Sequence, residues 1–364
     1  MADPDQLDQQ IDRHRRDLRT DKLDITYGEL SSMYQDNELV IDPEYQRLFR
    51  WSSSKKSGFI ESLLLGIPAP AVFVAETDKG IWELVDGLQR ISTVLEFMGV
   101  LRDANTDSVP PSTLVSPSRR SKLTELEGMT FERLTLRSRL SLKRASCRVE
   151  VLKIGSSTQA KYDLFERLNT GGEPLTEQEI RNCIFRASSP ELMNHIDELA
   201  EFTPFSENLG LSDKQQESKF DRGLVMRFFA LKNGLEDFHH EVESFITDFF
   251  REVVEGKRDF DLAAESKIFQ ETFRLLGNAM TEDIWRHYRS NSHRGGFSVY
   301  VFEAIAISVG QNIASVATLE PEEIRKRVMM LKTDPEFLAN TGGGANSRSK
   351  LRGRIAAGER IFSV

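Results

Sequence analysis

The feature that most constrains the fold is a change of hydrophobic pattern near residue 186. Before it, short alternating apolar runs are separated by Gly, Pro, Asn and Asp, which is typical of strands mixed with helices. Beyond it, nearly every apolar run has the period of an amphipathic helix. The pattern predicts an α+β domain followed by an all-α domain. The predicted divisions are a charged arm at 1–21, the mixed domain at 22–186, a helical domain at 187–340 and a Gly-rich basic tail at 341–364.

Charge and hydropathy exclude several classes of protein. The chain carries a net charge of −9, so it gains nothing from long-range attraction to nucleic acid, and any contact with DNA must be local. The N-terminus has no apolar signal core, and no window approaches the ~20 apolar residues of a membrane span. Cys147 and Cys183 do not form a metal-spaced pair. We therefore expect a cytoplasmic protein without a membrane segment and with reduced thiols.

Local patterns predict the elements of the mixed domain. Thr26 and Glu29 form a capping box that opens a helix to about residue 35, and Ser52 to Ser54 are natural caps for another helix. Further elements are predicted as follows: strands at 22–25 and 38–42, a hairpin at 71–85, a helix at 88–98, small strands and a short helix within 123–142, a strand at 147–154, and helices at 158–168 and 176–185.

A strand-to-helix turn at Asp86–Arg90 is the first candidate site. A strand ends, Gly87 permits a tight turn, and a helix begins at Leu88. Backbone N–H groups at a helix start attract phosphate, and Arg90 adds a forked cation within the first turn. Asp86 could hold a divalent cation or a ribose hydroxyl. Taken alone, the same residues also fit a plain turn before a packed helix.

Two further segments carry polar side chains that could join such a site. Gln46 and Arg47 lie among aromatic residues, and an arginine there could grip phosphate or stack on a base. Asn169 ends a predicted helix and is followed by Gly171 and Gly172, which free the backbone. The alternatives are a core of aromatics with surface arginines in the first case, and an ordinary helix C-cap in the second. No Walker A loop and no His-Glu-x-x-His motif occurs.

Taken together, these motifs resemble one family. The order and distances are similar to those of the N-terminal domain of GmrSD-type restriction systems, which is also found in SspE-like antiphage proteins. The resemblance covers about residues 22–186. It is carried by Tyr45–Trp51, Gly66–Pro68, Asp86–Arg90, Phe165–Gly172 and Glu179–Asn182.

The resemblance implies a ParB/sulfiredoxin-like fold with a nucleoside triphosphate site, where hydrolysis regulates a nuclease. Catalysis would involve Asp86, Arg90, Arg47 and Asn169, with Asp86 as a ligand of Mg²⁺. The implied nucleotide-binding residues are Gln46, Arg47, Asp86, Gly87, Gln89, Arg90, Asn169, Gly171 and Gly172.

Two departures from the family pattern qualify this expectation. The family signature reads Asp-Gly-Gln-Gln-Arg, whereas this chain has Leu88 at the third position, so binding is a safer expectation than hydrolysis. The histidine-asparagine-histidine nuclease module of two-domain members does not occur between 187 and 364. The chain therefore resembles a sensor or regulator whose nuclease or defence partner would be a separate protein.

Three alternatives stay open from the residues alone. The fold could serve as a DNA-binding or protein-interaction module without turnover, or the chain could be a DNA nickase. The basic tail bears on the first of these, because five Lys and Arg residues face only Glu359 there. It could be a flexible solvated tail, capture phosphate, or make a local contact with DNA.

Overall fold

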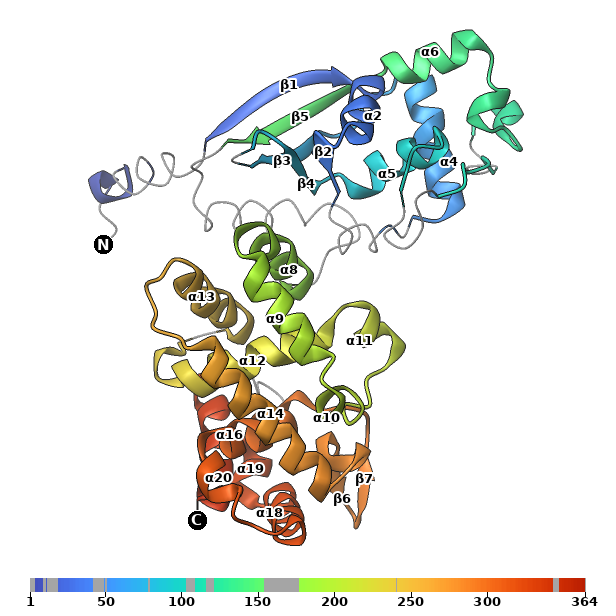
Figure 1. Ribbon diagram of the computed structural model, residues 1–364. Coiled ribbons are helices and arrows are strands. Elements are labelled where there is room, and N and C mark those ends of the chain that lie inside the picture. The colour runs from blue at the N-terminus through green and yellow to red at the C-terminus, as the bar shows by residue number, and fades with distance from the viewer. Residues whose placement is uncertain are drawn as a thin grey trace. The chain divides into compact units, whose positions relative to one another are not determined.

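The structure is a computed structural model, and its contacts divide the chain into two compact units, Met1–Pro174 and Leu175–Val364. The predicted division near 186 falls inside α8 (Glu177–Ser188), a helix of the second unit. The units are drawn in Figure 1. The described residues are 4–8, 11, 19–41, 49, 51–77, 79–102, 109–115, 121–153, 177–239, 241–342 and 347–363.

A mixed five-stranded sheet forms the centre of the first unit (Figure 1). Its strands are β1 (Thr20–Thr26), β2 (Leu39–Val40), β3 (Val72–Glu76), β4 (Trp82–Asp86) and β5 (Ser146–Leu152), in the order β1-β5-β3-β4-β2. The hairpin predicted at 71–85 is the antiparallel pair β3 and β4. β5 runs parallel to β3 and antiparallel to β1, and β2 runs parallel to β4. The α+β class predicted for this domain is confirmed.

Helices begin where the sequence places capping side chains. The Thr26 hydroxyl accepts a hydrogen bond from the Glu29 N–H at 3.1 Å, and the Ser52 hydroxyl accepts one from the Lys55 N–H at 3.3 Å. These caps satisfy N–H groups that have no partner within the helix. The helices of this unit that follow a cap or turn are α2 (Tyr27–Gln35), α4 (Ser53–Leu64), α5 (Leu88–Phe97) and α6 (Leu136–Arg144).

The segment 123–142 differs from its prediction. The small strands predicted there are wrong, because the chain forms two 3₁₀ turns, Thr124–Leu126 and Phe131–Arg133, and then α6. Thr135 starts α6 by accepting from the Ser138 N–H at 3.3 Å, and Leu142 is its buried contact. The Thr135 cap and the burial of Leu142 therefore favour a helix here, although apolar and polar residues weakly alternate in the sequence. The helix predicted at 158–168 lies outside the described residues.

The second unit is helical, as predicted, around a core rich in phenylalanine. One feature was not predicted: β6 (His287–Arg289) and β7 (Ser292–Arg294) form a hairpin whose strands are too short to show an alternation. Glu303–Ile307 forms a π-helical turn within the run 299–311. The main helices after α8 are α9 (Pro190–Ala200), α12 (Phe220–Gly234), α13 (Val242–Val254), α14 (Leu262–Ala279), α18 (Pro321–Thr333) and α20 (Arg348–Phe362); the shorter ones are α10 (Thr203–Ser206), α11 (Asp213–Glu217), α15 (Val299–Phe302), α16 (Ser308–Gln311), α17 (Ile313–Val316) and α19 (Pro335–Ala339).

The prediction of a basic tail at 341–364 is wrong. Most of this segment is α20, which packs into the core of the second unit through Leu351, Ile355 and Phe362. Three of its arginines have protein partners: Arg354 pairs with Glu303, Arg352 donates to the carbonyls of residues 235 and 236, and Arg360 pairs with Asp334 at 2.9 Å. This segment contains apolar residues at helical spacing, but the many basic residues between them made the pattern hard to recognise in the sequence.

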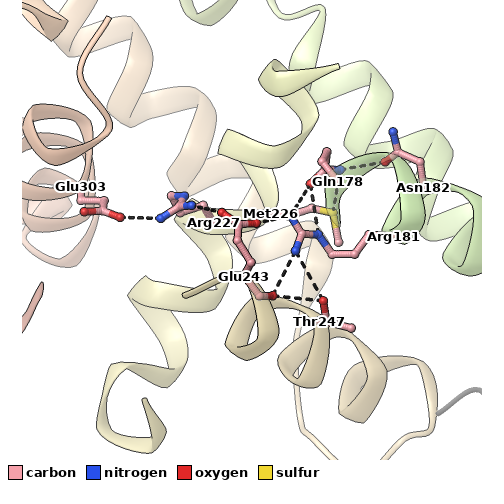
Figure 2. Close-up of polar contacts among 8 residues, drawn as sticks. All are labelled: Gln178, Arg181, Asn182, Met226, Arg227, Glu243, Thr247 and Glu303. Atoms are coloured by element: carbon pink, nitrogen blue, oxygen red, sulfur yellow. Dashed lines mark hydrogen bonds and ion pairs between the residues drawn. The ribbon is translucent and has the colours of Figure 1, made fainter. Parts of the chain in front are cut away.

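Buried charges connect α20 to α8, and Figure 2 shows the part of this network that runs from Arg181 to Glu303. Arg354 and Arg227 both pair with Glu303, at 2.5 and 2.6 Å, and Arg227 also pairs with Glu243. Arg181 of α8 pairs with Glu243 at 2.5 Å. Burial alone would raise the pKa of Glu243, but Arg227 and Arg181 hold it below its ordinary value. Arg181, Arg227 and Arg354 are therefore part of the core of this unit.

Candidate functional site

The Asp86–Arg90 turn joins β4 to α5 at one end of the sheet. Gly87 is the N-cap of α5 and has φ of +101°, a left-handed conformation that favours glycine. A Cβ on Gly87 would lie 2.5 Å from Cγ1 of Val72, the first residue of β3. The helix start is thus held against the neighbouring strand by a contact that only glycine permits.

The start of α5 has no side-chain cap. Leu88 and Gln89 are its first two helical residues, and the Arg90 N–H already donates to the Gly87 carbonyl at 3.0 Å. A helix start of this kind carries partial positive charge and suits an anion. This is the feature on which the predicted phosphate site depends.

Arg90 is fixed at this turn by two hydrogen bonds. Its Nη1 donates to the Pro70 carbonyl oxygen at 2.7 Å, and its Nη2 donates to Asp86 Oδ2 at 2.7 Å. The Arg90 side chain is 13% exposed and that of Asp86 is 36% exposed, so the pair faces solvent on the carboxylate side. The guanidinium is preorganised by partners that leave some of its five N–H donors for a ligand.

The charge of Arg90 also reaches the end of the sheet. Burial raises the pKa of Tyr27 and of the Cys147 thiol, and the positive charge of Arg90 acts in the opposite direction on both groups. Cys147 is buried in β5, as the sequence predicted for a reduced thiol. Arg90 is therefore a source of positive potential where β1, β3 and β5 meet.

Leu88 and Gln89 point to different surroundings. Leu88 is 4% exposed, so the residue that departs from the family signature is part of the core. Gln89 Oε1 accepts a hydrogen bond from the Trp51 N–H at 3.0 Å, which connects α5 to the segment before α4. The glutamine that remains in the signature thus has a structural contact at this turn.

The structure describes part of the predicted site. It brings together Asp86, Gly87, Gln89 and Arg90 within one turn. In the described part of the chain, no group of three or more His, Cys, Asp or Glu residues is placed to hold a metal ion. Asp86 alone fits a single carboxylate ligand, the number that Mg²⁺ commonly takes when phosphates and water complete its shell. The other predicted residues, Gln46, Arg47, Asn169, Gly171 and Gly172, lie outside the described residues.

Sequence reasoning missed three partners of this turn: the Pro70 carbonyl, the Val72 side chain and the Trp51 N–H. The i,i+4 spacing of Asp86 and Arg90 was a local signal for their ion pair. The other three contacts are made across the fold, and no local pattern marks them.

Comparison with known proteins identifies one domain. Residues 28–186 match the family described as GmrSD restriction endonuclease, N-terminal domain. The matched residues include the Asp86–Arg90 turn. No curated protein and no solved structure matches the chain significantly. No helix in the described residues is long and apolar enough to cross a membrane.

Proposed function

We propose that this chain, whose residues 28–186 match the GmrSD N-terminal domain family, is a nucleotide-binding regulator in a restriction-like antiphage system. The observation that carries the proposal is the Arg90 guanidinium, held at the uncapped start of α5 by Pro70 and Asp86. A fixed cation at a helix start without a side-chain cap is a common arrangement for binding phosphate. The protein would act in the cytoplasm.

The ligand in this proposal is a nucleoside triphosphate with Mg²⁺. Arg90 and the first N–H groups of α5 would bind phosphate oxygens. Asp86 would bind the metal ion, and a phosphate that takes donors from Arg90 would loosen the Asp86–Arg90 pair. Gln46, Gly171 and Gly172 would complete the pocket.

Hydrolysis is the finer part of the proposal. Asn169 would position water or the metal ion, and Arg47 would stabilise the charge that develops on the phosphate. One preorganised donor of this kind is worth about 10²–10³ in rate. Leu88 stands where the family signature has its first glutamine. It is buried, so the substitution lies at a core position. Turnover would then control a separate nuclease or defence partner.

Calorimetry with each of the four nucleoside triphosphates tests the binding site. We expect Arg90→Ala to abolish binding, since a charge-assisted hydrogen bond to phosphate contributes about 1.5–3 kcal/mol and Arg90 can form more than one. Arg102→Ala is the matched control. Arg102 follows the other end of α5 and likewise donates to a side-chain oxygen, of Asn37, and to a backbone carbonyl, of Gln35.

Thermal unfolding of each variant separates loss of the site from loss of the fold. Arg90→Lys keeps the charge but not the fork, so it should bind weakly rather than not at all. Unchanged affinity in a folded Arg90→Ala protein would refute the assignment.

The second candidate is a DNA-binding or protein-interaction module without turnover, with DNA nicking as a variant of it. Release of phosphate from each nucleotide, with and without DNA, distinguishes the two. No release under any condition, together with salt-sensitive DNA binding, favours the module. A plasmid assay with Mg²⁺ or Mn²⁺ tests nicking.

A further inference from the structure

The sheet of the first unit has one long edge, the outer side of β1 (Thr20–Thr26). β1 is the last strand in the sheet order, beside β5, as Figure 1 shows, and within the described residues no strand pairs with its other side. The opposite end of the sheet is β2, which has only two residues. The edge of a sheet presents a row of N–H and C=O groups with which another strand can pair.

The hydrogen bonds to β5 determine which backbone groups of β1 point to this edge. The Lys153 N–H donates to the Arg19 carbonyl at 2.8 Å, and the Tyr27 N–H donates to the Ala145 carbonyl at 3.1 Å. Bonded residues alternate along an antiparallel pair. The odd-numbered residues of β1 therefore bond to β5, and the backbone groups of residues 20, 22, 24 and 26 point outward.

Two exposed charges of opposite sign lie at the outward positions. The Lys22 side chain is 69% exposed and that of Asp24 is 55% exposed. On β5, Glu150 pairs with Lys22 at 3.3 Å and Arg148 pairs with Asp24 at 3.0 Å. Each of these pairs lies directly opposite in the register, so the four side chains share one face of the sheet. Their signs alternate along each strand and across the two strands.

The charges of β1 are complementary to those of a second copy of β1. If the second copy runs antiparallel along the edge, a two-fold axis at Leu23 places Lys22 of each chain opposite Asp24 of the other. The alternation of signs between β5 and β1 then continues through the strands of the second copy. Opposite charges that face each other across neighbouring strands stabilise the pair.

Other registers lack this complementarity. An axis at Lys22 places that lysine opposite its own copy, and an axis at Asp24 does the same for the aspartate, so like charges would face each other. An axis between two residues would pair outward backbone groups with groups that already bond to β5. The axis at Leu23 joins outward groups to outward groups, sets opposite charges across the strands and uses all seven residues of β1.

The Asp21 carboxylate occupies part of this edge in the single chain. Its Oδ1 accepts a hydrogen bond from the Lys22 N–H at 2.8 Å. In the pairing about Leu23, the same N–H would donate to the Asp24 carbonyl of the second copy, so a second strand must displace this carboxylate. Charged side chains at an edge limit pairing with unrelated strands.

We propose that the protein forms a homodimer in which β1 pairs antiparallel with β1 of a second copy, about an axis at Leu23. The two five-stranded sheets would then form one continuous sheet. The interface does not include the Asp86–Arg90 turn, which joins β4 to α5. The dimer therefore goes beyond the proposed nucleotide binding, and its failure would leave that proposal unchanged.

Sedimentation equilibrium of the full-length protein measures the dissociation constant of the dimer. We expect Lys22→Glu and Asp24→Lys each to weaken the dimer by roughly 10- to 100-fold, because two symmetry-related pairs become like-charged. An equimolar mixture of the two variants should regain the dimer, since the acidic edge of one variant meets the basic edge of the other. Lys79→Glu is the matched control: Lys79 is exposed in the turn between β3 and β4, and the same charge reversal there should leave the dissociation constant unchanged.

Two further variants test the backbone contact. Lys22→Pro removes an outward N–H and no hydrogen bond to β5, so it should prevent the dimer in a folded protein. Asp21→Ala frees the same N–H and should tighten the dimer. Circular dichroism verifies that each variant is folded.

Several outcomes would overturn the proposal. A wild-type protein that sediments as a monomer at every concentration at which it is soluble would leave this edge to a strand of another protein. A dimer that persists unchanged in Lys22→Glu and Asp24→Lys would form through another surface. The proposal also fails if the mixture of these variants stays monomeric, if Lys79→Glu weakens the dimer as much as Lys22→Glu does, or if Asp21→Ala does not tighten it.

Discussion

The two units use arginine for different purposes. In the second unit, Arg181, Arg227 and Arg354 are almost wholly buried and share two carboxylates, Glu243 and Glu303. In the first unit, Arg137 and Arg144 are exposed, and Arg90 keeps one edge toward solvent. The comparison shows that basic residues in this sequence do not by themselves mark a binding surface. Arg137 and Arg144 differ from the buried arginines because, in the part of the chain that the structure describes, no carboxylate pairs with them, and Arg90 is intermediate because Asp86 of β4 pairs with it.

The largest expected effect comes from breaking the buried network. Glu303→Ala leaves Arg227 and Arg354 without their carboxylate in a buried environment, which typically costs about 3–5 kcal/mol. Guanidinium unfolding followed by circular dichroism measures the loss. Glu132→Gln is the control from the first unit, where Glu132 and Arg139 form a largely exposed pair at 3.6 Å. The unfolding midpoint of that variant should not change, because exposed pairs contribute little. Equal losses in the two variants would remove the distinction between the units.

A smaller effect is expected at the turn of the first unit. Gly87→Ala combines a left-handed φ with a Cβ 2.5 Å from Val72, so we expect a loss of about 2–5 kcal/mol from strain and overlap together. Gly80→Ala is the control, since Gly80 has φ of +76° but nothing within 4 Å of its Cβ position. It should lose only the conformational part, about 1–2 kcal/mol. Thermal unfolding compares the two, and a larger loss in Gly80→Ala would contradict the close packing at Gly87.

The smallest expected effect, counted per pH unit, is a change in unfolding free energy caused by the buried side chain of Lys332. Lys332 is 1% exposed and donates to the Asp283 carbonyl at 2.6 Å, and burial lowers its pKa to about 7. Between this value and the unfolded value near 10.5, the unfolded chain binds more protons than the folded protein. Stability should therefore rise with pH across this window, by at most about 1.4 kcal/mol per pH unit.

Lys332→Met should flatten this dependence, because it removes the group that titrates. Unfolding free energies measured at pH 7, 8 and 9 would give the slope for both proteins. An equally steep slope in the variant would show that other groups cause it. His287 and His293, whose pKa values burial also lowers, titrate below this window.

Local signals in the sequence were sufficient where a structure depends on neighbours along the chain. The caps Thr26 and Ser52, the hairpin and the Asp86–Arg90 turn all depend on residues within a few positions of one another. The change from mixed to helical pattern likewise predicted the two fold classes. These features follow from backbone preferences and short-range hydrogen bonds, which a sequence displays directly.

The rest depends on partners that are distant in sequence. From the sequence alone, Arg354 is one of several basic residues in a predicted tail. Its role in the core depends on Glu303, which lies on another helix. The Pro70 carbonyl that holds Arg90 leaves no trace in sequence, because every residue has a carbonyl.

The backbone N–H of Trp51 donates to the side chain of Gln89, the residue before Arg90, so a tryptophan is bonded directly to this turn. The Trp51 ring lies against Phe59 of α4, with centroids 5.7 Å apart. Indole emission changes with the polarity and rigidity of its surroundings. The Asp86–Arg90 turn thus carries an intrinsic optical probe, so that events at this turn are open to observation in the unlabelled protein.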